Sequence, residues 1–200
     1  GFEPIGDDCT VYPMGDEALV MTTDMLVEDV HFLRGVSSAE EVGEKSLMVN
    51  ISDVAAMGAK PVATLLSIAL PESAQGEWAE KFMRGYYEAS KREGVALVGG
   101  DTTASKDKIV INVVAIGRAP MANIKRRSAA KIGDIVAVTG KLGTSSKGLV
   151  DIMFGDLNTV AARAHRRGQA RVAEGIWLGT RSEVHAMMDI SDGIASDIRH

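Results

Sequence analysis

The sequence predicts a protein of mixed α and β structure in two parts, and three observations support this. Strand-like and helix-like segments alternate along the first 118 residues, as in domains where helices pack on a sheet. After that point come a proline, a basic turn and no clear hydrophobic periodicity. The composition is that of an ordinary globular chain: 200 residues, 46% hydrophobic, 24% charged, net charge −5. We therefore expect one domain over residues 1–118 and the first part of a second over residues 119–200.

The first expected elements are a strand over residues 18–24 and a helix that opens at Ser38. The strand is a β-branched and apolar run that ends in polar residues. Ser38 followed three residues later by Glu41 is the pattern of a capping box, in which each side chain bonds the other residue's backbone amide. The helix should run to about Met57, with Gly58 as its C-terminal stop.

A strand, a second helix and two further strands complete the first part. The nearly continuous apolar run over residues 62–70 predicts a strand that is buried on both faces. A helix with an apolar stripe is expected over residues 75–92, with Gly94 at its end. Strands over residues 95–98 and 108–117 follow, joined by the loop GGDTTASKD.

The second part is expected to alternate in the same way. Strands over residues 134–139 and 184–188 enclose a Gly-rich turn, a helix and a polar helical stretch, and a last helix begins at Ser191. The turn GTSSKGLV has glycines at P-loop spacing, but Leu149 and Val150 stand where that motif requires Lys and Ser or Thr. No G-x-G-x-x-G follows a strand either, so neither standard nucleotide-binding loop is present.

Charge and cysteine content narrow the functional classes. No basic run is combined with aromatic residues, so we expect no nucleic-acid partner. No apolar run is long enough to cross a bilayer and no signal-peptide pattern opens the chain, so we expect no membrane partner. Cys9 is the only cysteine, which favours a reducing, cytoplasmic compartment. Because the chain lacks an initial Met and stops inside an expected helix, we expect it to be part of a longer protein.

Five aspartates lie where an apolar segment meets polar residues or inside an apolar helix: Asp8, Asp24, Asp53, Asp101 and Asp189. Taken singly, each has a structural explanation as a turn residue, a cap or an early-helix charge. Carboxylates that converge at one edge of a sheet, however, repel one another unless cations hold them. Mg²⁺ prefers oxygen ligands and completes its shell with substrate phosphates. Together the aspartates predict a magnesium site for a polyphosphate substrate.

Smaller residues beside these aspartates fit the same interpretation. Thr22 and Thr23 add hydroxyl groups next to Asp24, and Thr102 follows Asp101. The pair Gly99-Gly100 would let the backbone come close to a phosphate.

Six strings, in order along the chain, resemble the thiamine-monophosphate kinases: IGDDCTVY, TTDMLVEDVHF, VNISDVAAMGAKP, VALVGGDTT, RRSAAKIGD and MDISDGIASD. That family belongs to the superfamily of aminoimidazole ribonucleotide synthetase and selenophosphate synthetase. The resemblance implies direct transfer of the ATP γ-phosphoryl group to thiamine monophosphate, which gives thiamine diphosphate and ADP. Because the acceptor is an ionised phosphate oxygen, in-line alignment and charge neutralisation by several Mg²⁺ would suffice for catalysis.

The resemblance also implies a role for each matching residue. The positions that match magnesium ligands are Asp8, Thr22, Thr23, Asp24, Asp53, Asp101, Asp189 and Asp192. Those that match or lie near ATP-binding positions are Gly100, Asp101, Arg127, Ser191 and Tyr86. His31 matches a substrate contact. We expect Asp53, Asp101 and Arg127 to carry catalysis.

The family fold implies an N-terminal mixed sheet with helices on one face, which pairs with a second subunit's sheet in a homodimer, and a C-terminal α/β domain only partly present here. The chain departs from the family over residues 162–181, where a Pro-containing stretch is usual. Two alternatives remain: a sibling ATP-dependent enzyme acting on a purine-pathway intermediate or selenide, or a non-catalytic module that binds Mg²⁺ and nucleotide. Cys9 has no lysine partner of the kind a selenophosphate synthetase would need.

Overall fold

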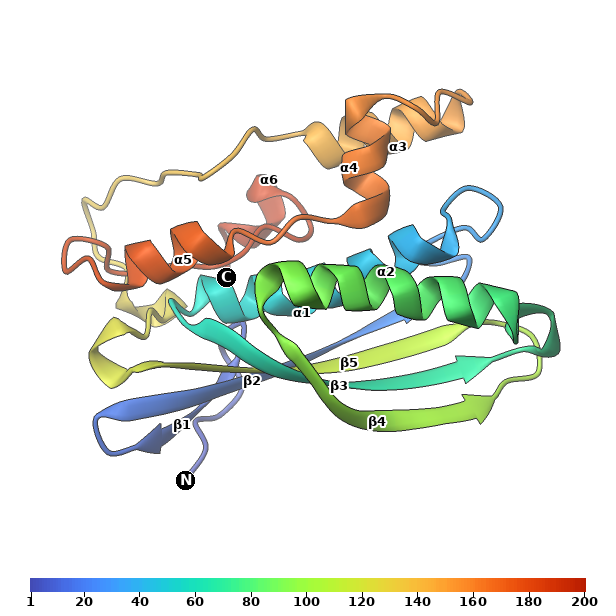
Figure 1. The fold of residues 1–200 in the computed structure, drawn as a ribbon. Helices are drawn as coiled ribbons and strands as arrows, with labels where there is room; N and C mark the ends of the chain where they lie inside the picture. Colours follow the sequence, from blue (N-terminus) through green and yellow to red (C-terminus); the bar gives the residue numbers. More distant parts are fainter.

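The computed structural model describes residues 1–200, which form three layers (Figure 1). The first layer is a five-stranded sheet in the order β1-β2-β5-β3-β4. Its strands are β1 (Thr10–Met14), β2 (Glu17–Val27), β3 (Lys60–Leu70), β4 (Ala96–Ala104) and β5 (Val110–Pro120). The second layer consists of two long helices, α1 (Ala39–Ala56) and α2 (Glu77–Glu93), and the third of residues 121–200, which lie over α1 on the side away from the sheet.

The sheet is mixed, as expected. β3 and β4 are parallel and are joined through α2, whereas every other neighbouring pair is antiparallel. The parallel pair requires a long crossover, which α2 provides. β1 was not anticipated from the sequence; it pairs with β2 from Thr10 to Met14.

Only one face of the sheet is covered, so its side chains alternate between buried and partly exposed. In β5, Ile111 and Val113 are buried against the helices. Val114 and Ile116 point to the opposite face of the sheet and remain partly exposed. The expectation that the strand at 62–70 is buried on both faces is wrong. Leu66 of that strand is buried, but its neighbour Ser67 is exposed because no layer covers the other face.

The first helix begins and ends where the sequence predicts. The Ser38 hydroxyl accepts a hydrogen bond from the Glu41 amide at 3.1 Å, and the Glu41 carboxylate accepts one from the Ser38 amide at 3.1 Å, which confirms the capping box. The helix ends at Ala56 with Met57 as its C-cap, and Gly58 follows with a φ of 75°. The second helix ends at Gly94 in the left-handed conformation, also as expected.

The loop predicted between the last two strands is shorter than expected. Residues 99–104 continue β4 and pair with Leu65–Leu70 of β3 in parallel register. The glycines and threonines of this stretch resemble a loop in sequence, but an edge strand needs only backbone groups for its pairing. The prediction of a loop over GGDTTA is therefore wrong.

The third layer is helical: α3 (Thr144–Met153), α4 (Val160–Arg167), α5 (Val172–Gly179) and the short α6 (Ile194–Asp197). The strands predicted at 134–139 and 184–188 are wrong, since neither segment pairs with another strand. A strand exists only through its partners, and here Ile135 and Val136 leave 93% and 65% of their surface exposed. The domain division at residue 118 remains a prediction. No helix of the chain is long and apolar enough to cross a membrane.

Candidate metal centre

Three aspartates that are far apart in the sequence meet at one point. Asp8 precedes β1, Asp53 lies in the last turn of α1, and Asp189 lies between α5 and α6. Each offers one carboxylate oxygen, and these oxygens all lie within 4.8 Å of one another. We refer to Asp8, Asp53 and Asp189 as the aspartate group.

Hydroxyl groups and one arginine hold these carboxylates in place. The Thr22 hydroxyl of β2 donates to Asp53 Oδ2 at 2.6 Å, and the Ser52 hydroxyl donates to Asp189 Oδ2 at 3.0 Å. The Arg127 guanidinium forms an ion pair with Asp8. The Arg127 backbone amide donates to Asp7 Oδ1 at 2.7 Å, which fixes the arginine beside the group.

The aspartate group carries more negative charge than its surroundings balance. Burial, followed by the charges of Asp189, Asp24 and Asp8, raises the pKa of Asp53 to about 8 despite the hydrogen bond from Thr22. Burial and the Asp8 charge raise the pKa of Asp189 to about 6. Burial also raises the pKa of Asp8 even though Arg127 pairs with it.

One atom of the group has no partner within the protein. Asp8 Oδ2 is buried and makes no hydrogen bond. A buried acceptor without a partner is costly, and a divalent cation would satisfy it while it neutralises the repelling carboxylates. Hard oxygen donors of this kind suit Mg²⁺. The residues therefore fit a magnesium site.

Asp24 lies next to the aspartate group and is fixed from both faces of the sheet. Its backbone amide donates to Asn50 Oδ1 of α1 at 2.8 Å. From the uncovered face, Asn112 Nδ2 donates to the Asp24 carbonyl at 3.2 Å and to the Thr23 hydroxyl at 2.8 Å. Burial raises the pKa of Asp24, and the nearby His31 acts in the opposite direction. His31 therefore lies close to the Asp24 side of the site.

Two other predicted metal ligands, Asp101 and Thr23, face away from the aspartate group. Asp101 lies on the edge strand β4 and pairs with the exposed Ser67. Because paired residues of neighbouring strands point to the same face, Asp101 belongs with Asn112 and Thr23 on the uncovered face. Ser191 and Asp192 are exposed in the turn before α6.

Gly100 has a structural reason to be glycine. Its φ is 151°, and a Cβ atom at this position would lie 1.7 Å from the Leu66 carbonyl oxygen of β3. Close packing between β3 and β4 thus explains the residue type. Its role in ATP binding remains a prediction.

The structure corrects the role expected for Tyr86. Its ring is fully buried between α2 and the sheet, and its hydroxyl donates to Thr64 Oγ1 at 2.7 Å. A side chain without accessible surface cannot contact a nucleotide, so the expected ATP contact is wrong. The amphipathic pattern of α2 turns this position toward the core.

Sequence reasoning missed several supporting residues: Asp7, Asn50, Ser52 and Asn112. Two of them had a signal. Asn50 lies three residues before Asp53 on the same helix face, and Asn112 is a single amide in the apolar run INVVAIG.

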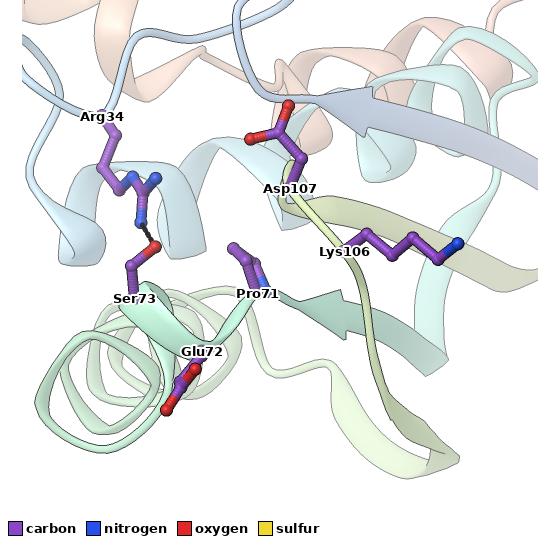
Figure 2. A pocket seen from close by; sticks show the side chains of 6 residues that line it. All are labelled: Arg34, Pro71, Glu72, Ser73, Lys106 and Asp107. Atoms are coloured by element: carbon purple, nitrogen blue, oxygen red, sulfur yellow. Dashed lines mark hydrogen bonds between the residues drawn. The ribbon is translucent and has the colours of Figure 1, made fainter.

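The loop that carries His31 is fastened at a separate, polar pocket of about 440 Å³ (Figure 2). Arg34 Nη1 donates to Ser73 Oγ at 2.9 Å in this pocket, and Arg34 Nε donates to the buried Glu28 carboxylate at 2.7 Å. None of the predicted site residues lines it. The pocket thus anchors the loop and is distinct from the aspartate group.

Comparison with known proteins agrees with the resemblance seen in the sequence. The family described as AIR synthase related protein, N-terminal domain, matches residues 6–119. The thiamine-monophosphate kinase of Bacillus subtilis is 37% identical over 208 residues, which cover 97% of this chain and 62% of that protein. The enzyme of that name from Escherichia coli is 34% identical over 98% of this chain and 61% of its own length. The chain thus spans about three fifths of the length of these curated relatives.

Solved structures show the same fold. The structure of AaThiL complexed with AMPPCP and TMP superposes with a TM-score of 0.90 at 35% identity, over 97% of this chain and 62% of that one. The thiamine-monophosphate kinase of Stenotrophomonas maltophilia superposes with a TM-score of 0.81 at 36% identity, over 97% and 63% of the two chains. The mixed α/β fold expected from the sequence is confirmed.

Proposed function

Because the chain belongs to the AIR synthase related family, we propose that this protein transfers the γ-phosphoryl group of ATP to thiamine monophosphate. The observation that carries the proposal is the aspartate group, whose buried and mutually repelling carboxylates need cations. The names of the relatives supply the acceptor, since curated proteins that match nearly the whole chain are thiamine-monophosphate kinases. The products would be thiamine diphosphate and ADP.

Asp8, Asp53 and Asp189 would hold Mg²⁺, with Asp24 beside them. The bound ions would neutralise charge on the polyphosphate. By resemblance, we propose Asp101, Thr23 and Asp192 as further metal ligands and Gly100 and Ser191 as nucleotide contacts. Asp101 and Thr23 lie on the uncovered face of the sheet, and Ser191 and Asp192 lie in the exposed turn before α6.

The protein's own side chains would mainly position the reactants. Thr22 and Ser52 each donate a hydrogen bond to one carboxylate oxygen, which fixes how Asp53 and Asp189 present their other oxygen. Arg127 adds a fixed positive charge at the Asp8 side, suited to a nucleotide phosphate. No side chain has to act as a strong base, since the acceptor phosphate is already ionised.

We also propose that two copies of the chain pair through the uncovered face of the sheet. Apolar side chains gather there without a covering layer: Leu19, Met21, Met25, Val114 and Ile116. An apolar sheet face without a second layer is typical of an interface. Light scattering on the purified protein should give the mass of a dimer, and a monomer at micromolar concentration would contradict the pairing.

We further propose a cytoplasmic location, supported by the single, buried and unpaired thiol of Cys9. Recovery of the native protein from an oxidising compartment in cell fractionation would argue against it.

A product assay tests the proposed reaction. The purified protein is incubated with ATP and Mg²⁺ and either thiamine monophosphate, thiamine or a purine-pathway ribonucleotide. We expect thiamine diphosphate from the first substrate alone. Replacement of Asp53 or Asp101 by Ala should lower kcat by at least about 100-fold while the fold is kept.

The same assay separates the alternatives. ADP formed only with the purine intermediate would identify a sibling enzyme. Nucleotide binding that requires Mg²⁺ but leads to no product would identify a non-catalytic module.

A further inference from the structure

Lys45 is a partly buried cation without a carboxylate partner. Its Nζ donates one hydrogen bond, at 2.9 Å, to the His31 carbonyl, and it forms no ion pair. The neighbouring acids on α1 are already neutralised, since Glu41 pairs with Arg166 and Glu44 pairs with Arg92. Burial lowers the pKa of Lys45, and no carboxylate offsets this effect. The ammonium group therefore lacks the anion that would balance it.

The surroundings of Lys45 supply further hydrogen-bond donors. His31 Nδ1 accepts from the Val27 amide at 3.0 Å, so the ring proton of the neutral imidazole resides on Nε2. Burial and then the charge of Lys45 lower the pKa of His165, so that ring also lies near Lys45. Ser145 contacts His165 Nδ1 at 2.8 Å. Ammonium, imidazole N–H and hydroxyl groups together form a suitable surrounding for an anion.

The same helix links Lys45 to the aspartate group. α1 carries Asp53 of the group, Asn50, which holds Asp24, and Lys45, which holds the loop of His31. Lys45 and Asp53 are eight residues apart, or about 12 Å along the helix axis. His31 lies close enough to Asp24 to affect its pKa.

Two cations are thus connected to the site. Arg127 pairs directly with Asp8, and Lys45 holds the backbone of His31, whose ring acts on Asp24. A transfer between two phosphate-bearing substrates brings two anions to one site, and each needs its own positive charge.

We propose that Lys45, together with His31 Nε2–H, binds the phosphate monoester of the acceptor substrate. This inference rests on the proposed phosphoryl transfer for the identity of the acceptor, but not for the anion site itself. Lys45 is assigned a direct contact with substrate, beyond its bond to the His31 carbonyl.

Isothermal titration of the purified protein tests the inference with two probes, thiamine monophosphate and inorganic phosphate. Three variants are compared with the wild type. K45Q keeps an N–H donor for the His31 carbonyl but loses the charge, K45R keeps the charge, and K91M removes an exposed lysine of α2 as a matched control. Thermal melts verify that each variant is folded, and a parallel titration measures binding of the Mg²⁺ complex of a non-hydrolysable ATP analogue.

We expect K45Q to bind both probes at least about tenfold more weakly, whereas K45R and K91M bind them within about threefold of the wild type. Binding of the ATP analogue should be unchanged in all three. Wild-type affinity of K45Q for both probes would overturn the inference and leave Lys45 a structural residue. Binding of inorganic phosphate but not of thiamine monophosphate to the wild type would contradict the proposed acceptor, while the comparison with K45Q would still decide whether Lys45 binds phosphate.

Discussion

At the scale of single residues, the raised pKa of Asp53 makes the site a source of instability when no cation is bound. A carboxyl group whose pKa is higher in the folded state holds its proton where the unfolded chain has lost it. For Asp53 this range runs from 3.8 to about 8. The folded state binds more protons in this range, so the stability of the cation-free protein should fall as pH rises through it.

Asp53→Asn should remove most of this pH dependence. The amide keeps an acceptor for the Thr22 hydroxyl but carries no charge. In EDTA at pH 8 we expect its Tm to exceed that of the wild type by at least about 2 °C, and the difference to vanish near pH 4. Thermal melts from pH 4 to 8 measure this. Asp156→Asn, at an exposed position, is the control and should follow the wild type. A wild-type Tm that rises steadily toward pH 8 would contradict the account.

At the scale of elements, helix α1 organises the site. Its last turns carry Asp53 and Ser52, its middle carries Asn50, and its first turns hold the third layer through a buried ion pair. Arg166 of α4 donates to both carboxylate oxygens of Glu41, at 2.8 and 3.0 Å. Glu41 thus joins the capping box of α1 to the layer that delivers Asp189.

Removal of Arg166 should therefore destabilise the protein strongly. Arg166→Met leaves the buried Glu41 carboxylate with only the half-exposed Arg167 at 3.7 Å, and loss of the hydrogen-bonded partner of a buried charge typically costs about 3 kcal/mol or more. Urea unfolding measures this difference. The double variant Glu41→Gln/Arg166→Met should recover much of the loss, because no buried charge is left unpaired. Lys81→Met, which breaks the exposed Lys81–Glu77 pair, is the control and should unfold like the wild type. Equal stability of Arg166→Met and the control would show that the pair does not hold the layers together.

The sequence predicted elements best where local chemistry decides them. The Ser38–Glu41 capping box and Gly94 define helix ends from a few adjacent residues, and both are confirmed. Strands depend on distant partners instead. The Gly-rich stretch of β4 is a strand because β3 offers an edge, and residues 134–139 are not, because no strand lies beside them.

At the scale of the whole molecule, the aspartate group exists because three layers converge. Asp8 comes from the start of the chain, Asp53 from α1 and Asp189 from the third layer. The sequence predicted the convergence of these residues only through their shared residue type and their position beside apolar segments. The sequence does not reveal which face of the sheet Asp101 lies on, because this depends on the register between β3 and β4. The burial of Tyr86, in contrast, follows from its place four residues after Phe82 on the apolar face of α2.

Binding of Mn²⁺, measured by electron paramagnetic resonance of the free ion, tests the central claim most directly. Mn²⁺ accepts the same hard oxygen ligands as Mg²⁺. We expect the wild type to bind Mn²⁺ at pH 8 and both Asp53→Asn and Asp189→Asn to bind it at least about tenfold more weakly, with Asp156→Asn unchanged. Equal Mn²⁺ affinity in the wild type and the two site variants would contradict the claim that these carboxylates form a cation site.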